Sequence, residues 1–173
     1  MTPAARVAAA IAVLDTIFAG HSAEKALSDW ARSSRFAGSK DRAALRDLVF
    51  DALRKQASSA AIGGALTGRG VMIGSLVQDG VDPATLCTGE GHAPSALTAE
   101  ETAHLRTPAT LAPHEAVDLP AWLWPVWQAD LGAQATPAAM TLRDRAPLFL
   151  RVNRRQGTVA DAIRSLDADT IEV

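Results

Sequence analysis

The segment Ala146–Gly157 constrains the fold most, because the hydrophobic pattern of the chain changes there. Its sequence is A-P-L-F-L-R-V-N-R-R-Q-G. Pro147 is expected to end the preceding helix, since proline lacks a backbone N–H and disfavours the helical conformation of the residue before it. Residues 148–152 have the composition of a short β-strand. We therefore expect a sheet to begin here, after a chain whose earlier patterns are helical.

The N-terminal third predicts three amphipathic helices. Thr2 and Pro3 are a typical helix start, and apolar residues then recur at three- and four-residue spacing until Gly20. Ser22 is a candidate cap for a second helix. The strongest helical pattern begins at Ser39. Its apolar stripe consists of Leu45, Leu48, Val49, Ala52 and Leu53.

The middle of the chain has shorter patterns. Residues 57–66 are rich in alanine and glycine and predict a short helix, and residues 67–70, T-G-R-G, predict a turn. The pair 82–83, Asp-Pro, predicts a helix of one or two turns. Thr98 and Glu101 have the spacing of a capping box, which predicts another short helix.

The last third predicts further helices around a tryptophan-rich segment. Residues 107–119 contain two prolines and are expected to form an irregular connection. Residues 119–127, L-P-A-W-L-W-P-V-W, contain three of the four tryptophans and predict a helix that continues to Gly132. The remaining expected elements are a helix over 136–145 capped by Thr136, a helix over 158–166 and the start of a strand over 170–173.

Composition limits the kinds of partner this chain can have. Its 173 residues carry a formal net charge of −2, so binding to nucleic acid would need a local basic patch. The single cysteine, Cys87, excludes an internal disulfide framework and a cysteine-rich zinc site. The N-terminal apolar stretch is interrupted by Arg6 and Asp15, and no apolar run approaches the ~18 residues of a membrane span. We expect a soluble, cytoplasmic protein without a membrane partner.

Residues that could perform catalysis are scattered. The four histidines, at positions 21, 92, 104 and 114, have no spacing that places two on one helical face. Cys87 has no general base beside it in the sequence. The glycine-rich segment 68–74 lacks both the G-K-[S/T] ending and the strand-to-helix context of a phosphate-binding loop. We predict no catalytic, cofactor-binding or metal-binding residue in this chain.

The clearest functional signal is an excess of arginine near the C-terminus. Between Met140 and Gly157 there are five arginines and one acid, Asp144. Guanidinium groups suit phosphate oxygens because they make two-point contacts. A second interpretation of these arginines, that some pair with acids across a domain junction, remains open. For the charged residues on the helix after Ser39, the alternative to phosphate binding is a solvated face with pairs between neighbouring turns.

The tryptophans Trp122, Trp124 and Trp127 also allow two interpretations. Aromatic rings can stack on bases. Large aromatic side chains more often fill a core or a domain interface. We expect packing.

Two segments carry a family resemblance. The run Leu119–Leu123, L-P-A-W-L, followed by a helix pair and by P-L-F-L-R-V-N at 147–153, resembles the Sun (Fmu, RsmB-like) family of bacterial RNA (cytosine-5)-methyltransferases. Upstream, the pattern over 40–54 resembles a helix of the NusB-like RNA-binding domain with which these enzymes begin. Residues 57–116 lack the later NusB motif, H-A-A-V-N, so the helical domain is divergent.

The resemblance implies a mainly α chain that leads into an α/β module. It implies a NusB-like helical bundle over 1–118, a helical connector over 119–146, and the beginning of a small β-α-β RNA-binding module over 147–173. In the family, a domain that binds S-adenosylmethionine and carries two catalytic cysteines follows. Cys87 matches neither cysteine, so we expect an N-terminal fragment whose cofactor and catalysis belong to residues outside it.

Two functions are therefore expected to compete. In the first, the chain positions ribosomal RNA for the family's cytosine methylation, with RNA and its own C-terminal methyltransferase domain as partners. The candidate RNA-binding residues are Arg143, Arg145, Arg151, Asn153, Arg154, Arg155, Arg42 and Arg46. In the second, the helical part binds a protein through the tryptophan segment, as the acidic residues 78–119 would allow. Exposed tryptophans would favour the second function, and a continuous arginine face the first.

Overall fold

The computed structural model describes residues 1–166, and the strand expected over 170–173 lies outside the described residues. In chain order the elements are α1 (Pro3–Phe18), α2 (Ala23–Ser33), α3 (Ser39–Arg54), α4 (Gln56–Gly63), α5 (Gly68–Gln78), the 3-10 helix η1 (Pro83–Thr85), α6 (Ala99–Leu105), α7 (Pro113–Ala116), α8 (Leu123–Leu131), the 3-10 helix η2 (Gly132–Gln134), α9 (Ala135–Thr141) and α10 (Val159–Ser165). All regular structure within residues 1–166 is helical, which confirms the prediction of a mainly α chain. No single helix among these residues is long and apolar enough to cross a membrane.

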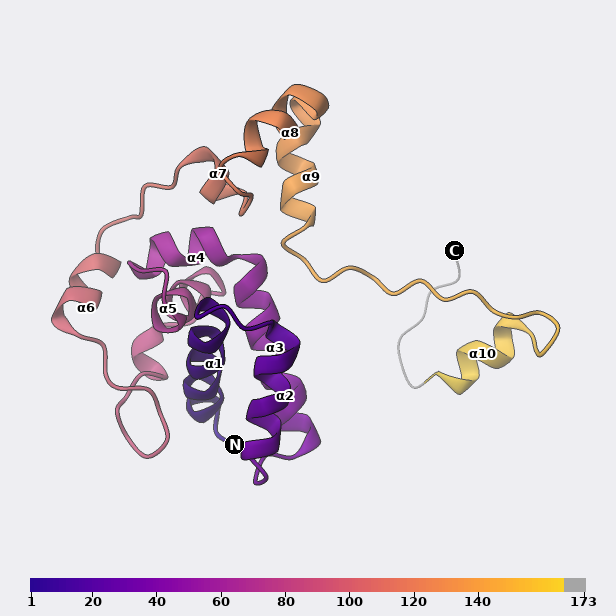
Figure 1. Ribbon diagram of the computed structural model, residues 1–173, viewed down its shortest axis with the longest axis horizontal. Helices are drawn as coiled ribbons and strands as arrows, with labels where there is room; N and C mark the ends of the chain where they lie inside the picture. The colour runs from indigo at the N-terminus through magenta and orange to yellow at the C-terminus, as the bar shows by residue number, and fades with distance from the viewer. Residues whose placement is uncertain (167–173) are drawn as a thin grey trace.

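Helices α1, α2, α3 and α5 form the main helical body. Helix α1 packs against the other three, and the N-terminus lies at the lower end of this body in Figure 1. The apolar stripe predicted for α3 is confirmed, because Leu45, Val49 and Ala52 are buried. The buried core cluster consists of Val7, Ala10, Val13, Leu14, Ala26, Leu45, Val49, Ala52, Val71, Met72 and Leu76.

Four predicted helix starts are confirmed by side-chain caps. The Thr2 hydroxyl accepts a hydrogen bond from the N–H three residues later, at 3.2 Å. Thr98 and Glu101 form the expected capping box. Ser22 and Thr158 cap α2 and α10 in the same way. These caps satisfy N–H groups that a helix cannot satisfy itself.

Helices α4 and α5 meet at 96° and pack closely at glycines. A Cβ atom on Gly63 would lie 1.8 Å from the carbonyl oxygen of Gly70. The turn predicted over 67–70 is wrong, because Thr67 caps α5 and residue 68 is already helical. The glycines there admit a neighbouring backbone, for which a side chain would leave no room.

The connection after α5 differs from the predicted elements in two places. The helix expected after Asp82 is a single 3-10 turn, η1, after which the chain turns inward and buries Cys87. The expected irregular segment 107–119 contains the short helix α7, which begins at Pro113. Glu115 supports that start by accepting the N–H of Ala112 at 2.8 Å.

Helices α8 and α9 form a hairpin with a core of its own. Trp124, Ala135 and Ala139 are buried there, together with residues 117 and 119, just before the hairpin. The predicted cap at Thr136 is wrong, because η2 follows α8 directly after the turn at Gly132 and α9 already begins at Ala135. Figure 1 shows this hairpin standing beside the main body.

The strand expected over 148–152 is an extended segment without a partner strand in the described part of the chain. A strand needs another strand to bond its backbone groups, and the sequence pattern alone cannot supply one. The expected helix after it is confirmed as α10. The β-α-β module as a whole remains a prediction.

Candidate nucleic-acid interface

The buried thiol of Cys87 lacks the surroundings of a nucleophile. Burial raises the pKa of the Cys87 thiol, and the nearby Arg69 only partly offsets this effect. Arg69 is itself bound to Glu101, with 2.6 Å between Nε and Oε1, and this hydrogen bond lowers the pKa of the Glu101 carboxyl. Within residues 1–166 no group of three or more histidine, cysteine or acidic side chains could hold a metal ion. The Cys87 thiol is therefore buried and has a raised pKa, which disfavours the thiolate form that a nucleophile needs.

This environment predicts slow modification of Cys87. The native chain should react with a thiol reagent at least about tenfold more slowly than the chain unfolded in urea, because a buried thiol with a raised pKa supplies little accessible thiolate. The release of the thiol reagent's chromophore measures both rates. Equal rates in the two states would contradict the burial of Cys87.

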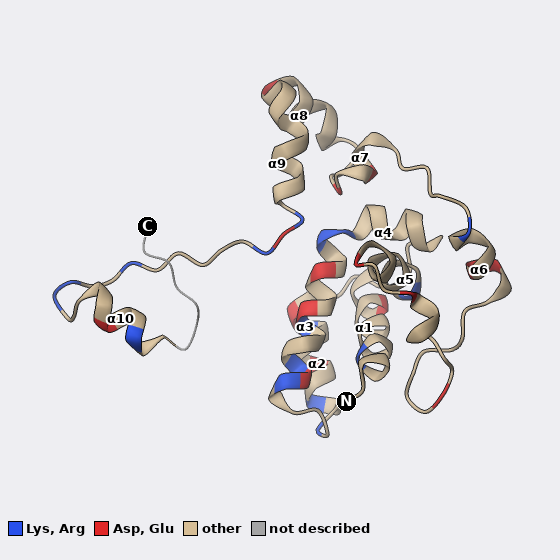
Figure 2. Ribbon diagram, turned by 180° about the vertical axis from the view of Figure 1, so that it is seen from behind, with Lys and Arg blue, Asp and Glu red and all other residues tan. Residues whose placement is uncertain are grey.

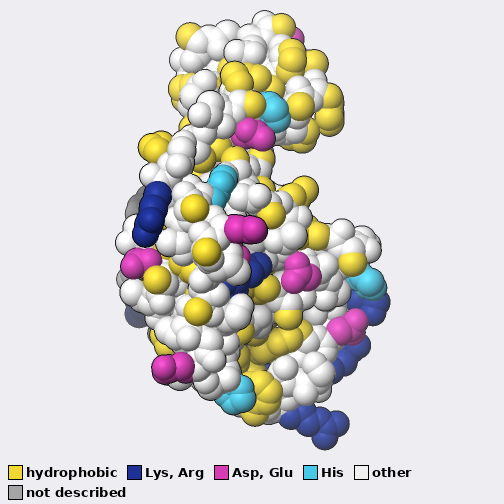
Figure 3. Space-filling model, turned by 90° about the vertical axis from the view of Figure 1, so that its left-hand side faces the viewer, with side chains coloured by type: hydrophobic (Ala, Val, Ile, Leu, Met, Phe, Trp, Pro, Cys, Tyr) yellow, Lys and Arg dark blue, Asp and Glu magenta, His cyan; other side chains and the backbone are white. Residues whose placement is uncertain are grey.

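The three clustered tryptophans divide between packing and exposure. Trp124 is buried and Trp127 is partly buried in the hairpin core, which confirms the expected packing for these two. Trp122 is 74% exposed, and Val126 is exposed one helical turn later. Figure 3 shows hydrophobic side chains gathered over the hairpin, at the top of the view. This surface is the one that the protein-interaction alternative requires.

Arg143 follows the end of α9, and its side chain contacts Asp118, which lies between α7 and α8, and Gln78 at the end of α5. Its Nε lies 3.1 Å from Oδ2 of Asp118, in a charge contact too bent to be a hydrogen bond. Its Nη2 donates a hydrogen bond to Oε1 of Gln78. The side chains of Arg143 and Asp118 are 14% and 2% exposed. Arg143 thus matches the alternative in which an arginine pairs across a domain junction.

Asp118 joins this pair to the start of α4. Its Oδ1 accepts the N–H of Ser58 at 2.8 Å, and its Oδ2 accepts the Ser58 hydroxyl at 2.8 Å. Helix α4 has no side-chain cap from its own N-cap residue, so Asp118 performs that role from a distant part of the chain. The side-chain amide of Gln78 donates a hydrogen bond to the hydroxyl oxygen of Ser59 at 2.9 Å. We call Ser58, Gln78, Asp118 and Arg143 the Asp118 junction.

Sequence reasoning missed Asp118 because its partners lie far away in the chain. The one local signal is the missing cap at α4, which begins directly after Lys55. Asp118 also has a positive φ of 54°, which aspartate and asparagine tolerate better than most residues. This conformation turns the chain from α7 toward the hairpin.

The other three predicted arginines of the helical part and the hairpin end lie on the surface. Arg42 and Arg46 are exposed on α3, and Arg42 donates to the carbonyl oxygen of Ala37 at 3.0 Å. Arg145 is exposed and lies 3.8 Å from the carboxylate of Asp47, which also approaches Arg46. Arg145 and Arg46 therefore both lie near the carboxylate of Asp47, whereas Arg143 contacts Asp118.

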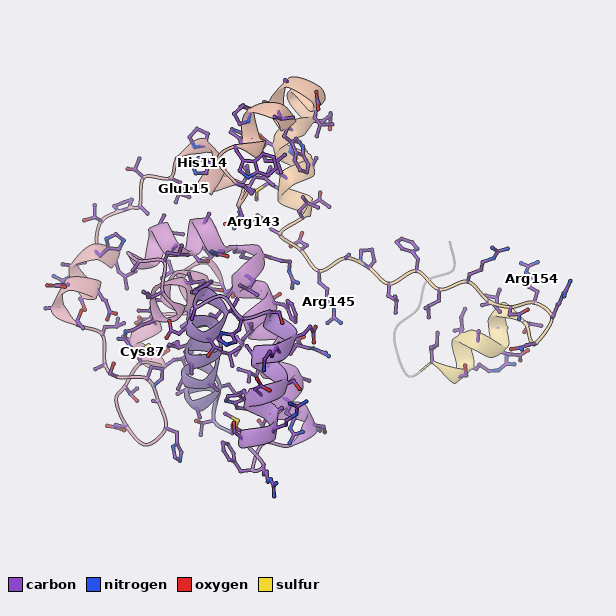
Figure 4. All side chains as sticks on the ribbon, in the orientation of Figure 1. Cys87, His114, Glu115, Arg143, Arg145 and Arg154 are labelled. Atoms are coloured by element: carbon purple, nitrogen blue, oxygen red, sulfur yellow. The ribbon has the colours of Figure 1, made fainter. Side chains whose placement is uncertain are left out.

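Arg151 lies in the extended segment, and Asn153, Arg154 and Arg155 follow it at the turn before α10. Arg151, Arg154 and Arg155 are exposed, and Figure 4 shows Arg154 reaching outward ahead of α10. The Asn153 side chain accepts the N–H of Arg155 at 3.1 Å and so shapes the turn. We call Arg151, Arg154 and Arg155 the C-terminal arginine group. Such a group can hold phosphate oxygens without any covalent chemistry.

The C-terminal arginine group lies in a part of the chain that is similar to a known family. Residues 119–173 match the family model of the RsmF/B-like methyltransferase ferredoxin-like domain. This part of the chain belongs to that family. No curated protein and no solved structure gives a significant match to the chain.

The match confirms the C-terminal half of the expected resemblance. Both L-P-A-W-L and P-L-F-L-R-V-N lie inside the matched residues, so the α8–α9 hairpin and the C-terminal arginine group belong to one RsmF/B-like segment. The segment begins one residue after Asp118. The Asp118 junction therefore joins the main helical body to RsmF/B-like residues through Arg143. The NusB-like character of residues 1–118 remains a prediction.

Proposed function

We propose that this chain positions RNA for an S-adenosylmethionine-dependent (cytosine-5)-methyltransferase domain that lies outside these residues, with ribosomal RNA as the substrate. The observation that carries the proposal is the exposed C-terminal arginine group inside the RsmF/B-like segment. Phosphate contacts of this kind fix the register of an RNA strand without reading its bases. The cofactor and the reaction belong to the absent domain.

The Asp118 junction supports this role by fixing one part of the chain against another. A positioning element works only if its supporting contacts are rigid, since small displacements of a substrate reduce the reaction rate strongly. Arg143 is held from two sides, by Asp118 and by Gln78. A groove of about 360 Å³ lies beside it, lined by Lys55, Gln78, Met140, Thr141, Arg143 and Asp144.

The salt dependence of RNA binding tests the proposal. The triple variant Arg151→Gln, Arg154→Gln, Arg155→Gln should weaken binding to a single-stranded RNA and reduce the slope of log affinity against log salt by about 2, because each lost phosphate contact removes about 0.7. Fluorescence anisotropy over a salt series measures both quantities. The matched control is Arg164→Gln, since Arg164 pairs with Asp161 on the same turn. An affinity that does not depend on salt would overturn the proposal.

A second function is favoured by one observation, the exposure of Trp122 and Val126 on the hairpin. Exposed aromatic residues on an apolar surface are typical anchors of protein interfaces. In this case the chain would bind a protein partner, and its RNA affinity would equal that of an unrelated protein of the same net charge. The salt series distinguishes the two functions directly.

A further inference from the structure

The connection between α2 and α3 holds a phenylalanine in an exposed and fixed position. Phe36 is 76% exposed, whereas Ser34 and Ala37 on either side of it are buried. The N–H of Ala37 donates to the carbonyl oxygen of Ser34 at 3.0 Å. The backbone N–H of Ser34 in turn donates to the carbonyl oxygen of Trp30 at 2.9 Å. We call residues 34–38 the Phe36 loop. Its backbone is anchored at both sides of the ring.

An isolated exposed apolar side chain is common on protein surfaces and needs no explanation. Phe36 differs because basic residues flank it in the sequence. Between residues 32 and 46 there are five basic residues and one acid, Asp41. Figure 2 shows Lys and Arg residues on the lower parts of α2 and α3, near the N-terminus, with acidic residues among them. Segment 140–157 has the same numbers, five basic residues and one acid.

Arg32 and Arg46 lie near the acids Asp29 and Asp47, and the acid between them in sequence, Asp41, is already paired with other groups. Asp41 accepts hydrogen bonds from Arg6, with 2.8 Å to Nη2, and from the N-terminal ammonium group at 3.0 Å. These contacts lower the pKa of the Asp41 carboxyl, chiefly through the ammonium group. The positive charges of Arg35, Lys40 and Arg42 are therefore not offset by Asp41.

The backbone adds a second anion-attracting feature. Helix α3 is 16 residues long, its N-cap is Gly38, and that residue supplies no side-chain cap. The first N–H groups of a helix attract anions when no side chain occupies them. The Arg42 side chain reaches back over this end, where its Nε donates to the carbonyl oxygen of Ala37 at 3.0 Å. The helix start and the cations thus lie at one place.

We propose that Phe36 stacks on an unpaired base of single-stranded RNA while Arg35, Lys40 and the start of α3 hold the adjoining phosphates. Bases in a duplex are stacked on each other and present no free face, so the site selects single strands. Stacking on a phenyl ring tolerates any base, which suits a site that positions RNA without reading it. This inference rests on the proposed function and adds a second contact region, separate from the C-terminal arginine group.

Substitutions of Phe36 in the full chain test the stacking. Phe36→Ala should weaken binding to a mixed-sequence single-stranded RNA about tenfold, because a base loses its stacking partner. Phe36→Trp should keep the affinity of the native chain, and Phe36→Leu should not, although it keeps the apolar volume. Binding to the duplex of the same sequence should change in none of the three variants. Thermal unfolding should remain unchanged, since the ring is exposed.

Matched controls separate this site from general effects. Arg35→Gln with Lys40→Gln should weaken single-strand binding and reduce its salt slope, whereas Arg32→Gln should not, because Arg32 pairs with Asp29. Leu66→Ala removes another exposed apolar side chain, remote in sequence from the cations. Equal loss in Leu66→Ala and Phe36→Ala would overturn the inference.

The outcomes also separate this inference from the proposed function. If the native chain does not bind RNA in a salt-dependent manner, the proposed function fails. If the native chain binds and the C-terminal arginine variant is weakened while Phe36→Ala binds normally, only the inference fails. If Phe36→Leu binds as well as the native chain, the ring contributes no stacking, and an apolar contact with a protein becomes the better explanation.

Discussion

The substitution Gly74→Ala is expected to lower the free energy of unfolding by about 3 kcal/mol or more. A Cβ atom at this position would lie 1.9 Å from the carbonyl oxygen of Ser59, which is far inside van der Waals contact. Both clashing groups belong to backbones of packed helices, so neither can rotate away. Urea unfolding followed by circular dichroism measures the change. Because domains of this size are stable by only about 5–15 kcal/mol, the variant should lose a large share of its stability.

Gly38→Ala provides the matched control for this substitution. Nothing lies within 4 Å of a Cβ atom built on Gly38, and the residue has an ordinary φ of −72°. The same chemical change should therefore alter the free energy of unfolding by less than about 1 kcal/mol. If Gly74→Ala were as stable as Gly38→Ala, the close contact between α4 and α5 would be disproved.

The contact between α4 and α5 also matters for the junction described above. Ser58 and Ser59 lie on α4 and Gln78 ends α5. The packing of these helices therefore aligns Ser58 with Asp118 and Ser59 with Gln78, and Asp118 and Gln78 are the side chains that hold Arg143. A variant that separates the two helices would release the Asp118 junction as well. Stability and positioning of the RsmF/B-like segment are thus linked through small residues.

The substitution Asp118→Asn is expected to cost roughly 3 kcal/mol of stability, because it leaves the Arg143 charge buried without its counter-ion. Asparagine keeps the size of the side chain and tolerates the positive φ of this position, so the loss reports the carboxylate itself, through its charge contact with Arg143 and the hydrogen bond from Ser58 that an amide nitrogen cannot accept. Urea unfolding measures the effect. A wild-type stability for Asp118→Asn would show that the carboxylate charge contributes nothing at the junction.

A double-mutant cycle with Arg143→Gln isolates the interaction between the two side chains. Removing both charges should cost less than the sum of the single changes, because neither partner then remains as an uncompensated buried ion. Arg145→Gln serves as the matched control, since Arg145 is exposed and only 3.8 Å from Asp47. This control should change stability by less than about 1 kcal/mol.

Sequence reasoning located the family segment and named the arginines that the proposed site uses. Its motifs lie within residues 119–173, where the family match was found. It left open whether some arginines bind phosphate or pair with acids in the chain, and Arg143 pairs with Asp118. It could not distinguish Arg143 from Arg154, because both are arginines in one basic stretch. Their difference arises from the position of Asp118, which only folding brings beside one of them.

The sequence by itself determined the starts of α1, α2, α6 and α10 and the buried stripe of α3. These features depend on partners within three or four residues in the chain, so the spacing of residue types in the sequence predicts them. Only the tertiary structure decided the cap of α4, whose acceptor Asp118 lies 60 residues away. It likewise decided that the glycines of α5 serve packing and that Trp122 remains exposed while Trp124 is buried. Each of these outcomes depends on which distant backbone or side chain occupies the neighbouring space, and no local pattern encodes that neighbour.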